Sequence, residues 1–237
     1  MYEFDVSPKL FTSNTIDLYK PKITHYVSND VLHRKFADWI IDKTLEISAE
    51  CGTTRLGLSS GSVLNEVYKT LANSDIFPPE NIEIYATNEI YKTNSIQKQI
   101  TQNLTKAKLE EARYYEFIDT NSDLSTVAQK YTEILDQFDD EEGFDICILQ
   151  VNSKGEIAGL TANGKGLSAN ENMVVINSQN ITISIPMILK SRHIALVIQD
   201  DNDILEEFLG GNKSATQFPV KILLAHPDVH IFYHLDI

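Results

Sequence analysis

The chain has 237 residues, of which 42% are hydrophobic, and its formal net charge at pH 7 is −14. This length and composition can bury one full core, and the acidic charge argues against nucleic acid, which needs a basic footprint. No run of about 18 apolar residues is present, so the sequence predicts no transmembrane helix and no membrane partner.

Segments with strand and helix patterns alternate along the chain. Strands are expected at 22–27, 55–58, 82–86, 114–118, 145–151, 173–176, 181–185, 193–198 and 229–233. Helices are expected at about 29–50, 62–71, 95–104, 123–135 and 204–209, with a short one just before Ser191. Alternation of this kind predicts βαβ units, and therefore an α/β fold with a mostly parallel sheet and helices on both faces.

The chain is expected to form one domain over 22–237, preceded by an N-terminal extension at 1–21 without clear periodicity. Its first residues lack a basic start followed by an apolar block, so secretion is not expected. Cys51 and Cys147 lie in or beside apolar segments, as reduced thiols of a cytoplasmic protein would. His226, His230 and His234 are expected on a turn and a strand as solvated or edge histidines, because their spacing by four converges on a metal only in a helix.

A serine-rich turn, Ser59-Ser60-Gly61-Ser62, joins the strand at 55–58 to the next helix. Such a turn offers unpaired backbone N–H groups and the positive end of a helix to an anion, and serine hydroxyls add donors. A capped strand–helix turn without a ligand is the alternative, since Ser-Gly is common at such turns. The turn is not a Walker loop, because no Gly-Lys-Ser/Thr follows it.

A second loop follows the apolar run that starts at Phe144 and ends at Val151, which has the pattern of a strand buried on both faces. In an open α/β sheet, ligands bind at loops that leave the carboxyl ends of strands. This loop carries Lys154, Gly155 and Glu156.

Both loops resemble those of the 6-phosphogluconolactonases and, more distantly, the amino-sugar-phosphate deaminases. Residues 149–167 align without a gap with the lactonase motif LGxGxDGHTASLFPG, in which the Asp falls on Lys154 and the catalytic His on Glu156. The positions that match are Gly155, Ala158, Leu160 and Leu167. The serine turn is similar to the family's phosphate-binding LSGGSTP loop, with Ser60 in place of a Gly. The resemblance covers about residues 22–236 and implies a Rossmann-like, doubly wound sheet.

Other family positions are partly kept. The family's Asp-Glu-Arg segment falls on Asn88-Glu89-Ile90, and two basic positions fall on Asn180 and near Asn202. Arg192 matches an Ala-Arg pair of the family, although a surface salt bridge explains it equally well. The substrate- and phosphate-binding set that the resemblance implies is therefore Ser59, Ser60, Gly61, Ser62, Asn88, Glu89, Lys154, Gly155 and Arg192.

The resemblance implies a hydrolase of carbohydrate metabolism, of the pentose phosphate pathway type, that opens a sugar-phosphate lactone with Glu156 as the candidate base. It implies a small-molecule sugar phosphate as ligand, no cofactor, no metal, and a monomer or homodimer.

The alternative is a catalytically impaired homologue, a pseudoenzyme that binds a sugar phosphate or a protein partner as a scaffold. Losing two cationic contacts weakens phosphate binding by about 3–6 kcal/mol, and losing the base slows the reaction by about 10²–10⁴-fold. The residues on their own favour this impaired or altered site. A deaminase or isomerase of amino-sugar phosphates is disfavoured further, because its Asp, His and Glu fall on Lys154, Glu156 and Thr161.

Overall fold

The computed structural model describes residues 19–91, 93, 95–104, 111–115, 117, 122–138, 142–169, 174–177, 179–199 and 202–234. Of the expected N-terminal extension, residues 1–18 lie outside this range. No helix among the described residues is long and apolar enough to cross a membrane.

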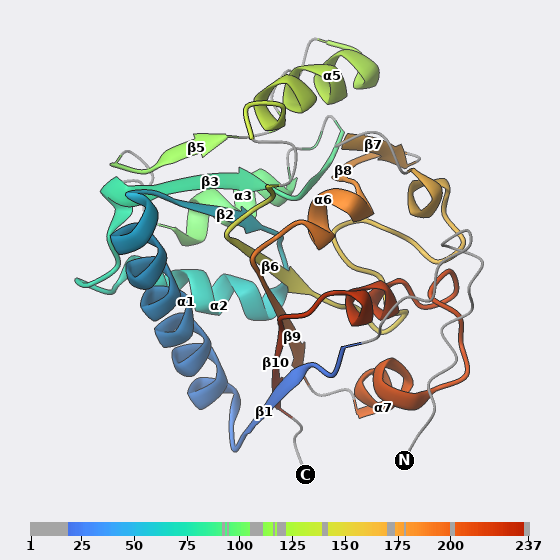
Figure 1. Ribbon diagram of the computed structural model, residues 1–237, viewed down its shortest axis with the longest axis horizontal. Helices are drawn as coiled ribbons and strands as arrows, with labels where there is room; N and C mark the ends of the chain where they lie inside the picture. Colours follow the sequence, from blue (N-terminus) through green and yellow to red (C-terminus); the bar gives the residue numbers. More distant parts are fainter. Residues whose placement is uncertain are drawn as a thin grey trace.

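The central sheet of the described chain has seven strands in the order β1-β10-β9-β6-β2-β3-β5 (Figure 1). The strands are β1 (Lys22–Tyr26), β2 (Thr54–Leu58), β3 (Ile82–Ala86), β5 (Arg113–Tyr115), β6 (Ile146–Gln150), β9 (His193–Gln199) and β10 (Val229–His234). Each strand pairs in parallel with its neighbours. The predicted mostly parallel α/β sheet is confirmed.

A small antiparallel sheet joins β4 (Asn88–Ile90), β8 (Asn180–Ile183) and β7 (Val174–Asn177). The strand at β4 was not expected, because three residues are too few to show a period. The strand expected at 181–185 ends at Ile183, because the Ser184 hydroxyl accepts a hydrogen bond from the Met187 N–H and so caps the next helix.

Helices cover both faces of the central sheet (Figure 1). On one face, α1 (Asn29–Cys51), α2 (Ser62–Ala72) and α3 (Ser95–Asn103) pack on side chains such as Ile146 and Ile148. On the other face, α5 (Leu124–Leu135), α6 (Ile185–Leu189) and α7 (Asn202–Gly210) pack on side chains such as Cys147 and Leu149. The alternating sides of β6 are thus both buried, as its unbroken apolar run predicted.

Short 3-10 turns complete the fold at η2 (Pro79–Asn81), η3 (Lys165–Ser168) and η4 (Pro219–Ala225). The expected start of α1 is confirmed, because the Ser28 hydroxyl accepts from the Val31 N–H at 3.3 Å. Leu32, Phe36 and Ile40 recur at helical spacing along α1 and are fully buried, whereas Leu45 on the same helix is 42% exposed.

The order of the strands places a topological switch point between β2 and β6. From β2 the chain continues through α2 to β3 on one side, whereas from β6 it continues to β9 on the other. The two connections leave on opposite faces, since α2 belongs to one core and α6 to the other. A crevice outside the carboxyl ends of β2 and β6 is therefore where a doubly wound sheet binds ligands.

The opposite, amino-terminal edge of the sheet is held by Asp228. Its carboxylate accepts from Lys22 Nζ at 2.7 Å on β1, and it contacts His193 Nδ1 on β9 and His230 Nε2 on β10. Burial raises the pKa of the Asp228 carboxyl, but the hydrogen bonds from Lys22 and His193 outweigh burial and hold that pKa well below its usual value.

This arrangement predicts acid-sensitive stability. The folded-state pKa of Asp228 is depressed, so its contribution is fully present above the unfolded pKa of about 3.9 and is lost as the pH falls towards the folded value. At about pH 6, Asp228→Asn is expected to lower the free energy of unfolding by about 1.5–3 kcal/mol. Urea unfolding at about pH 6 and about pH 3 should show this difference shrinking with acid. A difference that stays constant between the two pH values would contradict the assignment.

Two of the three C-terminal histidines are not solvated, contrary to expectation. His226 and His234 are each only 3% exposed. A ring nitrogen of His226 lies 2.6 Å from the Ser191 carbonyl oxygen, and one of His234 lies 2.8 Å from the Tyr26 carbonyl oxygen. His234 ends β10, which lies inside the sheet between β1 and β9, and His226 follows η4 directly, so each ring packs against neighbouring backbone.

Candidate functional site

The serine turn at the carboxyl end of β2 is fixed to β6. The Ser59 N–H and hydroxyl both donate to the Ile148 carbonyl oxygen, at 3.1 and 3.0 Å, and the Tyr68 hydroxyl donates to the Ser59 carbonyl oxygen at 2.6 Å. Ser59 is 2% exposed. Its hydroxyl is therefore committed to the fold, which leaves the half-buried Ser60 and the exposed Ser62 as the other hydroxyl donors of the turn.

The first turn of α2 receives a side chain from the neighbouring strand. Gln150 is the last residue of β6, and its Oε1 accepts from the N–H groups of Val63 at 3.2 Å and Leu64 at 3.5 Å. Gly61, the N-cap residue, makes no side-chain capping bond, and a Cβ built on it would lie 1.9 Å from Gln150 Oε1. The Gln150 amide thus lies in the place where a helix start presents its donors to an anion.

The loop after β6 is organised by Asn152. Its Oδ1 accepts from the N–H groups of Lys154 at 2.9 Å and Glu156 at 3.1 Å, and its Nδ2 donates to Glu156 Oε2 at 2.8 Å. The other carboxylate oxygen of Glu156 accepts from the Ala162 N–H at 3.3 Å. The half-buried Glu156 carboxylate is consequently held in one orientation by two neutral donors.

Gly155 lets this loop turn tightly against η4. Its φ is +73°, and a Cβ would lie 2.4 Å from Cδ2 of the Phe218 ring. The Val220 N–H donates to the Gly155 carbonyl oxygen at 2.8 Å. Lys154 beside it is exposed, and its ammonium has no hydrogen-bond or ion-pair partner in the described part of the chain.

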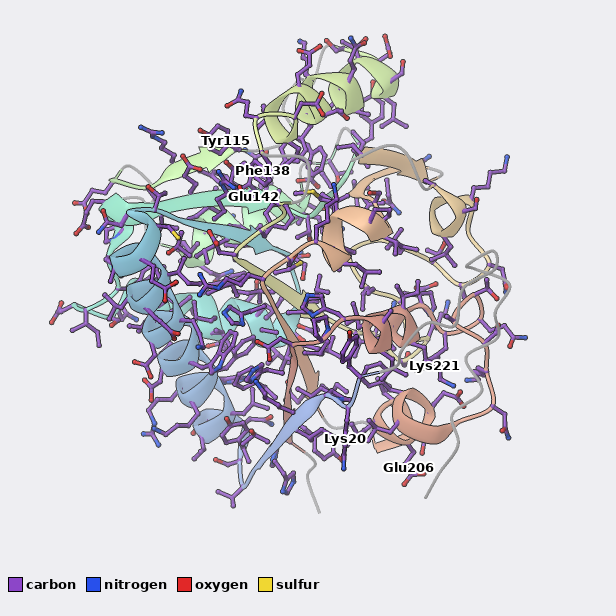
Figure 2. The ribbon with its side chains drawn as sticks, in the orientation of Figure 1. Lys20, Tyr115, Phe138, Glu142, Glu206 and Lys221 are labelled. Atoms are coloured by element: carbon purple, nitrogen blue, oxygen red, sulfur yellow. The ribbon has the colours of Figure 1, made fainter. Side chains whose placement is uncertain are left out.

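A buried ammonium supports η4 from behind. Lys221, 5% exposed, donates to Glu207 Oε1 at 2.6 Å and to the carbonyl oxygens of Gly211 and Lys213, each at 2.7 Å. Figure 2 shows Lys221 on η4, close to α7. These bonds fix the segment that carries Phe218, and therefore the wall against which Gly155 packs.

Residues after β3 complete the carboxyl edge. Asn88 is 8% exposed, and a Cβ on Gly159 would lie 3.3 Å from its Nδ2, so Asn88 borders the β6 loop. The Thr182 hydroxyl on β8 donates to the Ala158 carbonyl oxygen, which ties the small sheet to the same loop. Glu89 instead caps α3, because its carboxylate accepts from the N–H groups of Ile90, Ile96 and Gln97.

The structure brings most of the residues predicted for the site to one edge, but not Arg192. This residue immediately precedes β9, at the amino-terminal edge, and its Nη2 donates to Glu50 Oε2 at 2.8 Å. The alternative of a surface salt bridge is the arrangement observed. An ion pair between two exposed side chains contributes little to stability.

Gln150, Asn152 and Thr182 were missed by sequence reasoning. Gln150 and Asn152 stand where the lactonase motif has glycine, and a polar side chain at a position otherwise held by glycine was the available signal. For Thr182 no signal existed, because its contact with Ala158 depends on the antiparallel pairing of β8.

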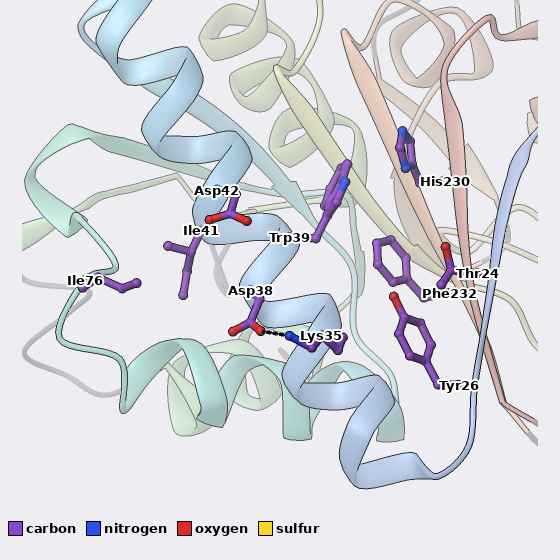
Figure 3. Close-up of a pocket in the computed structure, with 10 residues that line it drawn as sticks. All are labelled: Thr24, Tyr26, Lys35, Asp38, Trp39, Ile41, Asp42, Ile76, His230 and Phe232. Carbon is purple, nitrogen blue, oxygen red and sulfur yellow. Dashed lines mark hydrogen bonds and ion pairs between the residues drawn. The ribbon is translucent and has the colours of Figure 1, made fainter.

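A hollow of about 450 Å³ lies elsewhere, beside α1 and the β1–β10 edge of the sheet. Figure 3 shows Trp39, His230 and Phe232 on one side of α1, and Ile41 and Ile76 on the other. The strands β9 and β6 separate this hollow from β2 and the switch point. It is therefore distinct from the site described above.

The fold and the site define a doubly wound α/β protein with a serine turn and a carboxylate-bearing loop at its switch point. The chain belongs to the glucosamine-6-phosphate isomerase/6-phosphogluconolactonase family, whose model matches residues 27–231.

Individual relatives agree with this assignment. A 6-phosphogluconolactonase of Chlamydia pneumoniae is 24% identical over 177 residues, which cover 70% of this chain and 67% of that protein. The structure is similar to a 6-phosphogluconolactonase from Shewanella baltica, with a TM-score of 0.82 at 18% identity, covering 92% of this chain and 99% of the other. It is also similar to a monomeric glucosamine-6-phosphate deaminase, with a TM-score of 0.70 at 20% identity, covering 90% and 97% of the two chains. At these identities, the structural likenesses show the fold.

Proposed function

We propose that this protein hydrolyses the lactone ring of a sugar phosphate, with Glu156 as the general base. The observation that carries the proposal is the Glu156 carboxylate, which Asn152 and Ala162 hold at the carboxyl end of β6, beside the serine turn of the neighbouring strand. The relatives named 6-phosphogluconolactonase support the choice of substrate.

The chemistry needs one base and no redox step. Glu156 takes a proton from a water molecule, whose oxygen then bonds to the lactone carbonyl carbon. The tetrahedral intermediate collapses by breaking the bond from that carbon to the ring oxygen, and the ring oxygen receives the proton. The product is the open-chain acid, and the carboxylate of Glu156 is regenerated. The serine turn and the start of α2 bind the substrate's phosphate, and the Lys154 ammonium adds positive charge for it.

The test is the hydrolysis rate of freshly generated 6-phosphoglucono-δ-lactone with the intact protein at micromolar concentration. We expect a rate clearly above that of a blank with heat-denatured protein. A rate equal to the blank at every substrate concentration would rule out the hydrolase.

A catalytically impaired, sugar-phosphate-binding homologue is the second candidate. Two internal contacts favour this candidate. Gln150 occupies the N–H groups at the start of α2, and the Glu156 carboxylate is hydrogen-bonded within its own loop. Thermal unfolding with 6-phosphogluconate tests it, because ligand at 100 times its Kd stabilises a protein by about 2.7 kcal/mol. Stabilisation without lactone turnover would favour this candidate. Absence of both would contradict both candidates.

A further inference from the structure

The side chain of Gln150 occupies the group of donors that the proposed function assigns to the substrate's phosphate. Val63 and Leu64 are the second and third residues of α2, and their N–H groups have no acceptor within a helix. Gln150 Oε1 accepts from both, at 3.2 and 3.5 Å. A residue on a neighbouring strand thus serves as the cap that Gly61 cannot supply.

The Gln150 amide is packed closely against the turn that it caps. Gly61 has no side chain, so the Gln150 amide lies directly against its backbone, where a Cβ would come within 1.9 Å. Ser59 offers nothing further, because its hydroxyl is bonded to Ile148. An incoming phosphate would therefore compete with one neutral amide for the same two N–H groups.

We propose that Gln150 is a specificity-determining residue that closes the anion loop from within, so that phosphate binds only when the Gln150 amide is displaced. This inference rests on the proposed function, which places the substrate's phosphate at the serine turn. It adds that the Gln150 amide, an internal competitor, weakens the binding of phosphate at this position. A charged phosphate oxygen can still replace a neutral amide oxygen, because the helix start favours negative charge.

Two substitutions with opposite expected signs test the proposal. Gln150→Ala removes the competitor and is expected to lower the Kd for inorganic phosphate by about 10-fold, a change that corresponds to about 1.4 kcal/mol. Gln150→Glu places a carboxylate on the same N–H groups and is expected to raise that Kd by more than about 10-fold. Gln137→Ala changes an exposed glutamine two residues after α5; it is the matched control and should bind phosphate as the unchanged protein does.

The measurement is an NMR titration of the intact protein with inorganic phosphate, in which the backbone amide signals of Val63 and Leu64 are followed. Before phosphate is added, both signals should move in Gln150→Ala and remain in place in Gln137→Ala. Equal phosphate affinity in the unchanged protein and in both Gln150 variants, or the reverse order of affinities, would overturn the proposal. The titration requires no turnover. If the protein does not hydrolyse a lactone but Gln150→Ala binds phosphate more tightly than the unchanged protein, the proposed hydrolase activity is refuted and the competition between Gln150 and phosphate is supported.

Discussion

Glu156→Gln is expected to reduce lactone hydrolysis by about 10²–10⁴-fold, with little change in KM. The substitution preserves the size of the side chain and its bond from the Ala162 N–H, but an amide cannot accept a proton from water. Loss of kcat with KM unchanged is the signature of a group that acts in the reaction and not in substrate binding. The measurement is the initial rate over a range of lactone concentrations, after subtraction of the spontaneous rate.

The control must separate the loss of a base from the loss of a charge. Glu80→Gln removes the same charge from an exposed position in η2 and should leave the rate unchanged. Glu156→Gln also places the new amide NH₂ group opposite Asn152 Nδ2. Two hydrogen-bond donors then face each other, and this costs about 1 kcal/mol of stability. Urea unfolding of the variant will show whether it is still folded under assay conditions. If the folded variant retains the full rate, Glu156 is not the base.

The sheet and its helices were predictable because each is coded locally. Ile146, Cys147, Ile148 and Leu149 alternate between two buried faces, and an unbroken apolar run is the only pattern that satisfies both. The start of α1 was readable from Ser28, a residue whose side chain caps helices. β4 was not predictable, because its three residues form a strand only by pairing with β8, which lies far along the chain.

The location of the site could be predicted from the sequence, but the contacts within it could not. Strand order brings the ends of β2, β3 and β6 to one edge, and so the two loops meet as the pattern indicated. Which polar groups of the site form hydrogen bonds depends on side chains that extend from one strand to a neighbouring element. Gln150 bonds to α2 from β6, a contact between residues 86 and 87 positions apart. Arg192 matches the family motif in sequence, but it immediately precedes β9 and so lies at the amino-terminal edge of the sheet, away from the site.

Gly155→Ala is expected to destabilise the fold much more than Gly52→Ala, and the two glycines form a matched pair. Both have positive φ, +73° and +84°, where a side chain costs about 1–2 kcal/mol. A Cβ at Gly52 meets nothing within 4 Å, whereas one at Gly155 lies 2.4 Å from the Phe218 ring. Overpacking of that kind adds about 1–3 kcal/mol, so Gly155→Ala should cost roughly 2–5 kcal/mol in all.

Urea unfolding of the two variants measures the difference, and Phe218→Leu tests its cause. A smaller side chain at 218 leaves room for the new methyl group, so the double variant Gly155→Ala/Phe218→Leu should lose less stability than the sum of the two single changes. Equal costs at Gly52 and Gly155, or strict additivity with Phe218→Leu, would mean that the ring yields freely. In that case the hydrogen bond from the Val220 N–H to the Gly155 carbonyl oxygen, and not the Phe218 ring, would hold the loop that presents Glu156 against η4.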